Sequence, residues 1–304
     1  MAQNFGKVAV LMGGFSSERE VSLNSGRAIV AALQSKGVDA HPFDPQEKSL
    51  FDLVSDGYNR AFNILHGTFG EDGVVQGVLE FLGMPYTGCG VAASAIGMDK
   101  LRSRLLFAGC GLPNVPYEVL HDNTNFTVAE QRLGLPLFVK PAAEGSSVGV
   151  HKIKEAGQLA AIYPELKRYH GAVLAEKAIM GGEYACSVLG NRALPSIRII
   201  PANEFYDYEA KYQRDDTVYL CPSDLSAAEE AEVNALALKA FEAVGGRGWG
   251  RVDFLRDDSS NWYVLEINTV PGMTQHSLVP QAARAAGLSF ADLCVEILDH
   301  AAVG

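Results

Sequence analysis

Carboxylate, amide and guanidinium side chains recur at short, regular spacing in residues 251–272. Two apolar runs, joined by aspartates, serines and an asparagine that favour turns, predict a β-hairpin there. Because side chains alternate along a strand, Arg251 and Asp253 share one face, and Glu266 and Asn268 share a face of the second strand. A turn in the middle of the link brings the two pairs opposite each other. Such carboxylate and amide oxygens suit Mg²⁺ bound beside phosphate.

The apolar residues of the same hairpin are expected to point the other way. Alternation places Val252 and Phe254 on the face opposite the first polar pair. It likewise places Leu265 and Ile267 on the face opposite the second pair. Taken alone, the segment is also compatible with a half-exposed hairpin whose polar face is solvated, but the motifs that follow favour a metal site.

A glycine- and serine-rich loop forms a second candidate site. Lys140 ends an apolar strand, and residues 144–149 then offer two glycines, Ser146, Ser147 and a run of backbone amides. Such a loop can fold over anionic phosphates while the lysine supplies positive charge. The spacing of a P-loop is absent. The alternative is a flexible hairpin tip without a ligand.

A third candidate lies where another apolar strand runs into a glycine break. Glu176 and Lys177 close the strand, and Ile179, the glycine pair 181–182 and Glu183 follow. A strand that enters a hinge can present backbone groups to a planar base, and the carboxylate of Glu183 can accept hydrogen bonds from two ribose hydroxyls. The alternative is a solvated pair of charges at a strand end.

Three further segments place polar side chains at the ends of elements. Glu18 lies in the first turn of a helix that we expect to begin at Ser16 or Ser17, which are good N-cap types. Its alternative role is to complement the helix dipole. His66 ends a strand, where α/β sheets bind ligands. Ser277 begins a helix whose free amides suit a carboxylate.

The stretch 205–222 is rich in tyrosine and charge and has no clear periodicity. Connections of this length without secondary structure are usually lids or disordered segments, and the aromatic residues argue against disorder. We therefore expect a lid, with Lys211 and Tyr212 as its functional members.

Composition excludes several classes of protein. The chain has 304 residues, enough for two or three domains, with 48% apolar and 20% charged residues and a net charge of −11. That charge argues against a nucleic-acid-binding protein. No run approaches the ~18 apolar residues of a membrane span. The five cysteines are dispersed and odd in number, which indicates reduced thiols and a cytoplasmic location.

The order of the elements predicts an α/β (α+β) protein of three domains. Strands and helices alternate over residues 1–92, which is typical of a parallel-sheet domain. Residues 93–179 begin with a helix and continue with three short strands and a second helix. Residues 180–304 contain strands, an irregular stretch at 203–224, the hairpin and further helices. Ser226 and Glu229 form the pattern of a capping box.

These motifs, in this order, resemble the ATP-grasp superfamily and, within it, the D-alanine–D-alanine ligase family. The resemblance spans nearly the whole chain and rests on LMGGFSSEREVSLNSG, NILHGTFGEDG, YTGCGVAASAIGMDKLRS, VKPAAEGSSVGV, YDYEAKY and RVDF…LEINTVPGMTQHSLVPQAA. It implies a three-domain ATP-grasp architecture in a homodimer. It also implies that the chain joins two D-alanines, at the expense of ATP, into the dipeptide that ends the peptidoglycan stem.

The resemblance also implies the residues of the site. ATP would be bound at its phosphates, base and ribose by Lys100, Lys140, Ser147, Glu176, Lys177, Ile179, Glu183 and Lys211. Two Mg²⁺ ions, which Mn²⁺ can replace, would be held by Asp253, Glu266 and Asn268. A hydrogen-bonded trio would bridge three parts of the site: Glu18, Ser146 and Tyr212. The first D-alanine would lie near His66, and the carboxylate of the second near Ser277 and Leu278.

The expected reaction has two steps. The carboxylate of the first D-alanine attacks the γ-phosphate of ATP to give an acyl phosphate, and the amine of the second D-alanine then displaces phosphate. Arg251 and the backbone amide of Gly272 are expected to stabilise the oxyanion of the second step.

Two alternatives stay open. A D-alanine–D-lactate ligase is one, although lactate-type relatives commonly carry histidine where this chain has Tyr212. A non-catalytic nucleotide-binding regulator is the other, and the complete set of metal ligands together with Lys211 argues against it.

Overall fold

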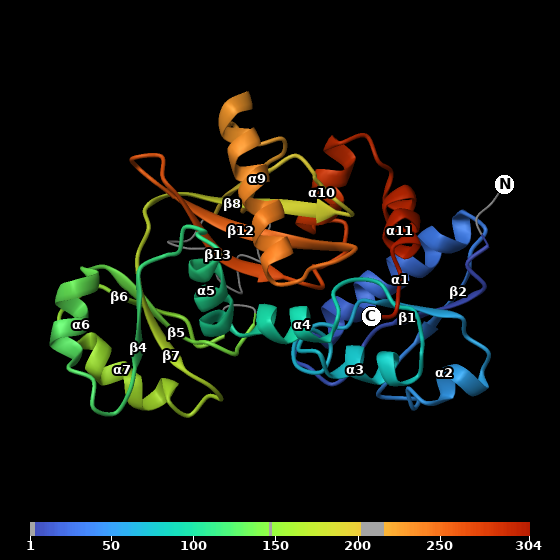
Figure 1. Cartoon of the computed structure of the whole chain (residues 1–304), viewed down its shortest axis with the longest axis horizontal. Helices are drawn as coiled ribbons and strands as arrows, with labels where there is room; N and C mark the ends of the chain where they lie inside the picture. Colours follow the sequence, from blue (N-terminus) through green and yellow to red (C-terminus); the bar gives the residue numbers. More distant parts are fainter. Residues whose placement is uncertain (1–3, 146–147, 202–215) are drawn as a thin grey trace.

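The computed structural model describes residues 4–145, 148–201 and 216–304, and it forms three β-sheets with helices around them. Figure 1 shows the four-stranded sheet at one end, the six-stranded sheet in the middle and the three-stranded sheet at the other end. The α/β (α+β) prediction is confirmed. None of the helices in these described ranges is long and apolar enough to cross a bilayer.

The N-terminal sheet is parallel, as its alternating strands and helices predict. Its strands lie in the order β2-β1-β3. The elements of this region are β1 (Lys7–Leu11), α1 (Arg19–Ser35), β2 (Asp39–Phe43), α2 (Asp52–Ser55), β3 (Arg60–Asn63) and α3 (Val74–Phe81). Two helices, α4 (Val91–Met98) and α5 (Lys100–Gly109), follow it and lead to the central sheet. After Lys7, the other four residues of β1 are apolar and buried, which is typical of a strand buried on both faces.

The predicted start of α1 at Ser16 or Ser17 is wrong. The N-cap is Glu18, and its side chain makes no capping hydrogen bond. Ser16 instead closes a turn before the helix, because its Oγ accepts from the Glu18 amide at 3.2 Å and its carbonyl accepts from the Arg19 amide at 3.2 Å. The carboxylate of Glu18 is therefore not used as a cap.

The central sheet is antiparallel, and its strands lie in the order β4-β7-β5-β6. Its elements are β4 (Tyr117–Leu120), α6 (Phe126–Leu133), β5 (Leu137–Pro141), β6 (His151–Ile153), α7 (Gln158–Leu166) and β7 (Val173–Lys177). Alternate residues of β5 face opposite sides, so Leu137 and Val139 pack under α6 and α7, whereas Phe138 and Lys140 face the rest of the chain.

The C-terminal sheet is antiparallel, in the order β11-β10-β8-β12-β13, with β9 beside β8. Its elements are β8 (Gly181–Leu189), β9 (Arg192–Ala193), β10 (Ile197–Ile200), β11 (Val218–Leu220), α9 (Ala227–Ala243), β12 (Trp249–Asp257), β13 (Trp262–Asn268), α10 (Leu278–Ala285) and α11 (Phe290–Asp299). β11 corrects the expectation of an irregular stretch at 203–224. That strand has three residues and, among the described residues, pairs with β10 alone, so the sequence carries little periodic signal for it.

The β12–β13 hairpin brings the two polar pairs opposite each other, as expected. Arg251 is opposite Asn268, and Asp253 is opposite Glu266. One prediction for the hairpin is wrong, because the register shifts after Asp253 and leaves Leu265 as an unpaired residue in a β-bulge. A bulge re-aims side chains, so Leu265 lines the same cleft as Glu266 instead of facing away from it.

Two helix starts agree with the sequence. Ser226 and Glu229 form the complete capping box of α9. Ser277 is the N-cap of α10, so the free amides of that helix begin at Leu278.

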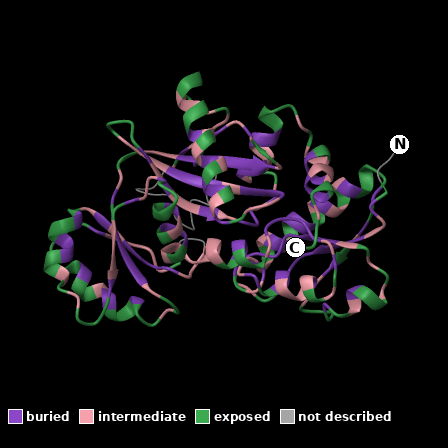
Figure 2. Ribbon diagram, in the orientation of Figure 1, coloured by how far each residue is buried: buried purple, intermediate pink, exposed green. Residues whose placement is uncertain are grey.

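Buried residues lie along all three sheets (Figure 2), and their side chains form separate cores. Val8, Ile29 and Ile64 of the N-terminal region share one core with Trp249 and Ile297 of the C-terminal region. The central sheet packs around a core drawn only from residues 120–175. Each sheet thus lies within one of the three predicted segments, and the boundaries near residues 92 and 179 stay predictions.

Candidate active site

Two adjoining cavities lie where the three sheets meet. The smaller, of about 120 Å³, is lined by Glu18, His66, Arg251, Glu266, Asn268, Gly272, Ser277 and Leu278, and is called the polar cavity below. The larger, of about 300 Å³, lies between the central and C-terminal sheets and is called the cleft; it is lined by Lys140, Glu176, Lys177, Ile179 and Glu183. Lys100 and Glu266 line both. The two cavities therefore adjoin along a lysine and a carboxylate.

Glu18 lies between two loops of the polar cavity. Its side chain is largely buried. A Cβ atom added to Gly67 would stand 3.3 Å from Glu18 Oε2, and one added to Gly145 would stand 3.8 Å from the same oxygen. The loop after His66 and the glycine–serine loop thus approach one carboxylate from two sides.

His66 is buried beside a second carboxylate. Its Nδ1 is 3.1 Å from Glu71 Oε1. Burial by itself lowers the pKa of His66, but the hydrogen bond to Glu71 and the negative charges of Glu71 and Glu18 raise it above its ordinary value. Burial also raises the pKa of Glu71. The floor of the polar cavity therefore holds protons more tightly than the same groups do in water.

The polar residues of the hairpin form a hydrogen-bonded cluster. Arg251 donates from Nε and Nη2 to the two carboxylate oxygens of Asp253, at 2.6 and 2.8 Å. Asn268 Nδ2 donates to Asp253 Oδ2 at 2.9 Å. The amide oxygen of Asn268 therefore points away from Asp253. Glu266 stands opposite Asp253, between the two cavities.

These hairpin residues fit a Mg²⁺ ion. The described residues contain no group of three or more histidine, cysteine, aspartate or glutamate side chains placed to hold a metal. The hairpin instead offers two carboxylates, Asp253 and Glu266, and the amide oxygen of Asn268. Mg²⁺ is commonly bound by one or two carboxylates while it keeps other positions for water and phosphate, so this donor set matches it.

The start of α10 forms the far wall of the polar cavity. Ser277 Oγ accepts from the Thr274 amide at 3.0 Å and lies 2.9 Å from Thr274 Oγ1. Any side chain at Gly272 would collide with this hydroxyl, because an added Cβ would stand 2.9 Å from Ser277 Oγ. Glycine at 272 thus brings its backbone close to Ser277 and to the helix amides that begin at Leu278.

Buried charges line the back of the cleft. Glu176 Oε2 is 2.7 Å from Lys140 Nζ, and Glu176 Oε1 is 2.5 Å from Arg104 Nη2. Arg104 also donates to the carbonyls of Val264 and Leu265, at 3.4 and 3.3 Å. The guanidinium therefore joins β7 of the central sheet to β13 of the C-terminal sheet.

These contacts set the charge of the cleft. Burial alone would raise the pKa of Glu176, but the positive charges of Arg104 and Lys140 outweigh it and hold that pKa below its usual range. Burial lowers the pKa of Lys140, and Arg104 and Lys100 add to this effect against the attraction of Glu176. Lys100 Nζ donates to the Glu144 carbonyl at 2.7 Å and is 3.4 Å from Glu266 Oε2. Three cations thus surround two carboxylates, which suits an anionic ligand.

Sequence reasoning missed several residues of the cleft. Arg104 is one, and nothing in its local sequence separates it from the exposed Arg102. The charged residues Lys152 and Arg198 were missed as well. So were apolar lining residues, among them Phe138, Val150, Met180, Ile200, Leu255 and Leu265. Strand alternation could have identified Phe138, which lies two residues before Lys140.

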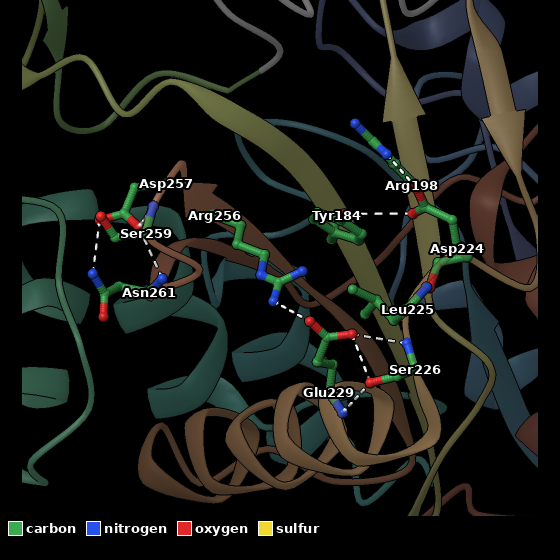
Figure 3. A network of polar contacts seen from close by, with 11 residues as sticks. Tyr184, Arg198, Asp224, Leu225, Ser226, Glu229, Arg256, Asp257, Ser259 and Asn261 are labelled. Atoms are coloured by element: carbon green, nitrogen blue, oxygen red, sulfur yellow. Dashed lines mark hydrogen bonds and ion pairs between the residues drawn. The ribbon is translucent and has the colours of Figure 1, made fainter.

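The glycine break at the start of β8 lets two backbones touch. Gly181 has a φ of 142°, and an added Cβ would stand 2.3 Å from the Arg256 carbonyl. Figure 3 shows the polar network around Arg256, which pairs with Glu229 at the start of α9. Hydrogen bonds from Ser226 and Arg256 lower the pKa of Glu229 to about 2. The network fixes the strand that carries Glu183.

Four predicted site residues, Ser146, Ser147, Lys211 and Tyr212, lie outside the described residues. The remaining predicted residues, apart from Asp253, line the polar cavity or the cleft. Asp253 lies just behind them and bonds to Arg251 and Asn268. The arrangement can hold a polyanion in the cleft with its end at Lys100 and Glu266. A small zwitterion in the polar cavity would meet carboxylates on one side and helix amides on the other.

Two family models match the chain. One, described as the D-ala D-ala ligase N-terminus, matches residues 42–89. The other, described as the D-ala D-ala ligase C-terminus, matches residues 106–299. The second alone covers more than half of the chain.

Curated relatives match over their whole length. The D-alanine–D-alanine ligase of Neisseria meningitidis serogroup B is 62% identical over 303 residues, which cover 99% of this chain and 100% of that protein. The D-alanine–D-alanine ligase of Laribacter hongkongensis is 56% identical over 304 residues, which cover 100% of this chain and 99% of that protein.

Two solved structures have the same fold. A crystal structure of D-alanine–D-alanine ligase from Bacillus anthracis has a TM-score of 0.85 and 36% identity, covering 97% of this chain and 96% of that one. A crystal structure of the Bacillus anthracis enzyme complexed with ATP has a TM-score of 0.83 and 33% identity, with the same coverage of 97% and 96%.

Proposed function

The chain belongs to the D-alanine–D-alanine ligase family, and from that premise we propose how its residues divide the reaction. It is an ATP-dependent ligase that joins two D-alanines for peptidoglycan synthesis. One observation carries the assignment. The polar cavity, which is sized for amino acids, adjoins the cleft, which is sized for a nucleotide, and Lys100 and Glu266 line both.

ATP occupies the cleft in this proposal. Lys140 and Lys100 bind its phosphates, because they bring positive charge to the end nearest the polar cavity. The strand end at Lys177 and Ile179 contacts the base, and Glu183 accepts hydrogen bonds from the ribose. Ser147 and Lys211 are assigned to the phosphates by family resemblance alone.

Asp253, Glu266 and Asn268 would hold two Mg²⁺ ions, for which Mn²⁺ can substitute. The support is the oxygen donor set of the hairpin and its position between the two cavities. Bound there, the metal would neutralise the charge of the phosphoryl group during transfer. Asn268 keeps its amide oxygen for this role because its nitrogen bonds to Asp253.

In the first step, the carboxylate of the first D-alanine attacks the γ-phosphorus, the bond to the β-phosphate oxygen breaks, and ADP leaves. Glu18 and His66 hold this D-alanine at the floor of the polar cavity. Glu18 accepts from its ammonium group, since it is a carboxylate placed between two loops of the site. Ser146 and Tyr212 complete the bridge with Glu18, again by resemblance.

In the second step, the amine of the second D-alanine attacks the acyl carbon and phosphate leaves. The helix amides from Leu278 and the hydroxyl of Ser277 bind the carboxylate of this D-alanine. Arg251 and the Gly272 amide stabilise the oxyanion, because both line the polar cavity beside the metal ligands.

The protein acts as a homodimer in the cytoplasm, where ATP is available. Val74 and Phe81 lie seven residues apart on one face of α3 and are 51% and 82% exposed. Val91, at the start of α4, lies beside Gly73 and is 40% exposed. Apolar side chains grouped in this way mark a contact surface, and a second copy of this chain is its proposed occupant.

A phosphate-release assay with ATP, Mg²⁺ and D-alanine tests the proposal. The expected result is phosphate release that depends on D-alanine and matches the dipeptide formed. Replacement of half of the D-alanine by D-lactate tests the sibling reaction, and an ester product in place of the dipeptide would favour it. ATP binding without phosphate release would favour the regulator.

A further inference from the structure

Two serines are buried on one face of α1. Ser22 and Ser25 are fully buried and lie three residues apart, so they share that face of the helix. Ser22 Oγ accepts from the Gly13 amide at 2.9 Å and donates to the Ile64 carbonyl at 2.7 Å. Ser25 Oγ accepts from the Met273 amide at 3.2 Å. Both hydroxyls therefore bond to distant segments of the chain.

The three segments that they hold all lead into the polar cavity. Gly13 begins the loop that carries Glu18, and Ile64 lies two residues before His66. Met273 directly follows Gly272 and precedes the turn that ends at Ser277. A single helix face thus fixes both walls of the cavity.

These hydroxyls have no other evident role. Serine is a weaker helix former than alanine, and a buried hydroxyl without a partner costs free energy. The neighbouring core is apolar and would accept alanine. The favourable free energy that serine contributes at these positions must then come from its hydrogen bonds to the two amides and the carbonyl.

We propose that Ser22 and Ser25 are positioning residues that serve different subsites. Ser22 sets the loops of Glu18 and His66, and so the first D-alanine. Ser25 sets the Gly272–Ser277 turn, and so the second D-alanine and the oxyanion. This division rests on the proposed function of the polar cavity.

The experiment compares Ser22→Ala and Ser25→Ala with the unaltered protein. Dipeptide formation against D-alanine concentration gives separate constants for the two subsites. Hydroxylamine, supplied in place of the second D-alanine, traps the acyl phosphate as a hydroxamate, because its nitrogen attacks the acyl carbon and phosphate leaves. With hydroxylamine in large excess, so that it captures most of the acyl phosphate before a second D-alanine reacts, the D-alanine concentration that half-saturates hydroxamate formation reports the first subsite. Ser94→Ala is the matched control, since Ser94 is equally buried and its hydroxyl donates to the nearby Cys89 carbonyl, at 3.4 Å, rather than to a loop of the polar cavity.

Ser25→Ala is expected to raise the constant of the second D-alanine roughly fivefold and to leave half-saturation of hydroxamate formation unchanged, as loss of one hydrogen bond predicts. Ser22→Ala is expected to do the reverse, and Ser94→Ala to change neither. Ser25→Cys, with a weaker acceptor of similar size, should show a smaller rise in the same constant and covers the case in which Ser25→Ala does not fold.

Equal changes in both constants for Ser22→Ala and Ser25→Ala would overturn the division, and so would no change in either. A different result would contradict the proposed function itself and not only the division between the serines. If the unaltered protein forms neither dipeptide nor hydroxamate from D-alanine, the assignment of the cavity fails, whatever the serines do.

Discussion

The central sheet packs around a core of its own, whereas the N-terminal sheet shares its main core with the C-terminal region. Leu137, Leu159 and Val173 contact only residues of the central region within their core. Val10 and Ile29 instead pack in the same core as residues of α10 and α11. Bodies with separate cores move relative to one another unless a large apolar interface joins them.

Because of this difference, we expect the polar cavity to be rigid and the cleft to change its width. The polar cavity is lined mainly by segments of the shared core, so its walls are fixed when the chain folds. The cleft lies between two cores and is crossed by the charges of Arg104, Lys140 and Glu176. We expect selection of D-alanine to depend on a rigid site, and ATP binding to involve adjustment of the central sheet.

Glu266 belongs to both cavities, so its replacement should have the largest effect. Glu266→Gln keeps the shape of the side chain but removes one negative charge from the proposed metal site. Loss of several kcal/mol of transition-state stabilisation corresponds to roughly a thousandfold lower turnover. The measurement is phosphate release at saturating substrates, with the melting temperature as control for folding. Turnover near that of the unaltered protein at ordinary Mg²⁺ would remove Glu266 from the site.

Arg104→Gln should disconnect the two bodies. Removal of one partner from a buried ion pair costs about 3–5 kcal/mol of stability. The Michaelis constant for ATP should rise about tenfold or more, while both D-alanine constants stay within about twofold. Arg104→Lys keeps the charge but cannot reach Glu176 and the β13 carbonyls together, so it should be intermediate. A larger effect on D-alanine than on ATP would contradict the separation of the cavities.

Ser277→Ala tests the polar cavity, which we expect to be the rigid site. Ser277 is assigned only to the carboxylate of the second D-alanine, and loss of one charge-assisted hydrogen bond costs roughly 1.5–3 kcal/mol. The constant of the second D-alanine should rise accordingly, with the constants of ATP and of the first D-alanine nearly unchanged. Steady-state kinetics with each substrate varied in turn is the measurement. An equal rise for both D-alanines would remove Ser277 from this role.

The smallest effect concerns pH and the floor of the polar cavity. The pKa of His66 is raised by Glu71 and Glu18, so its contribution to stability is complete below its ordinary value and is lost as pH rises through the folded value. The raised pKa of Glu71 acts in the same direction. The free energy of unfolding should therefore fall as pH rises above about 4.5, the ordinary pKa of Glu71, and continue to fall above about 6.5, the ordinary pKa of His66, until both groups have lost their protons in the folded protein.

Denaturant unfolding of the unaltered protein and of a His66→Gln, Glu71→Gln double variant checks this slope. The double variant carries neither titrating group and should lose most of the pH dependence. The same slope in both proteins would show that other groups cause it.

The hairpin was predictable because its information is local. Alternating side chains and a turn-rich link are enough to place the pair Arg251 and Asp253 opposite the pair Glu266 and Asn268. The orientation of Leu265 was not predictable, since the bulge depends on how β12 pairs with two strands at once. Arg102 and Arg104 occupy the same short helix, and only tertiary packing decides which is buried.

The start of α1 shows the same limit. Both serines before Glu18 are good N-caps in isolation. In the folded loop, however, Ser16 forms a turn, and the helix begins after Glu18. The serine pair within α1 was likewise not identified, because its partners lie as far away as Met273. Local signals predict elements, whereas contacts between distant segments place the side chains of the site.

Distances between labelled helices test the central claim most directly. Spin labels at positions 131 of α6 and 232 of α9 span the cleft, and labels at positions 31 of α1 and 232 span the shared core; Gln131, Ala31 and Glu232 are exposed. Cys110, which is also exposed, is replaced by serine in both proteins. On addition of a non-hydrolysable ATP analogue with Mg²⁺, the first distance should change and the second should stay constant. A constant first distance, or equal changes in both, would contradict the separation of a rigid amino-acid site from an adjustable nucleotide cleft.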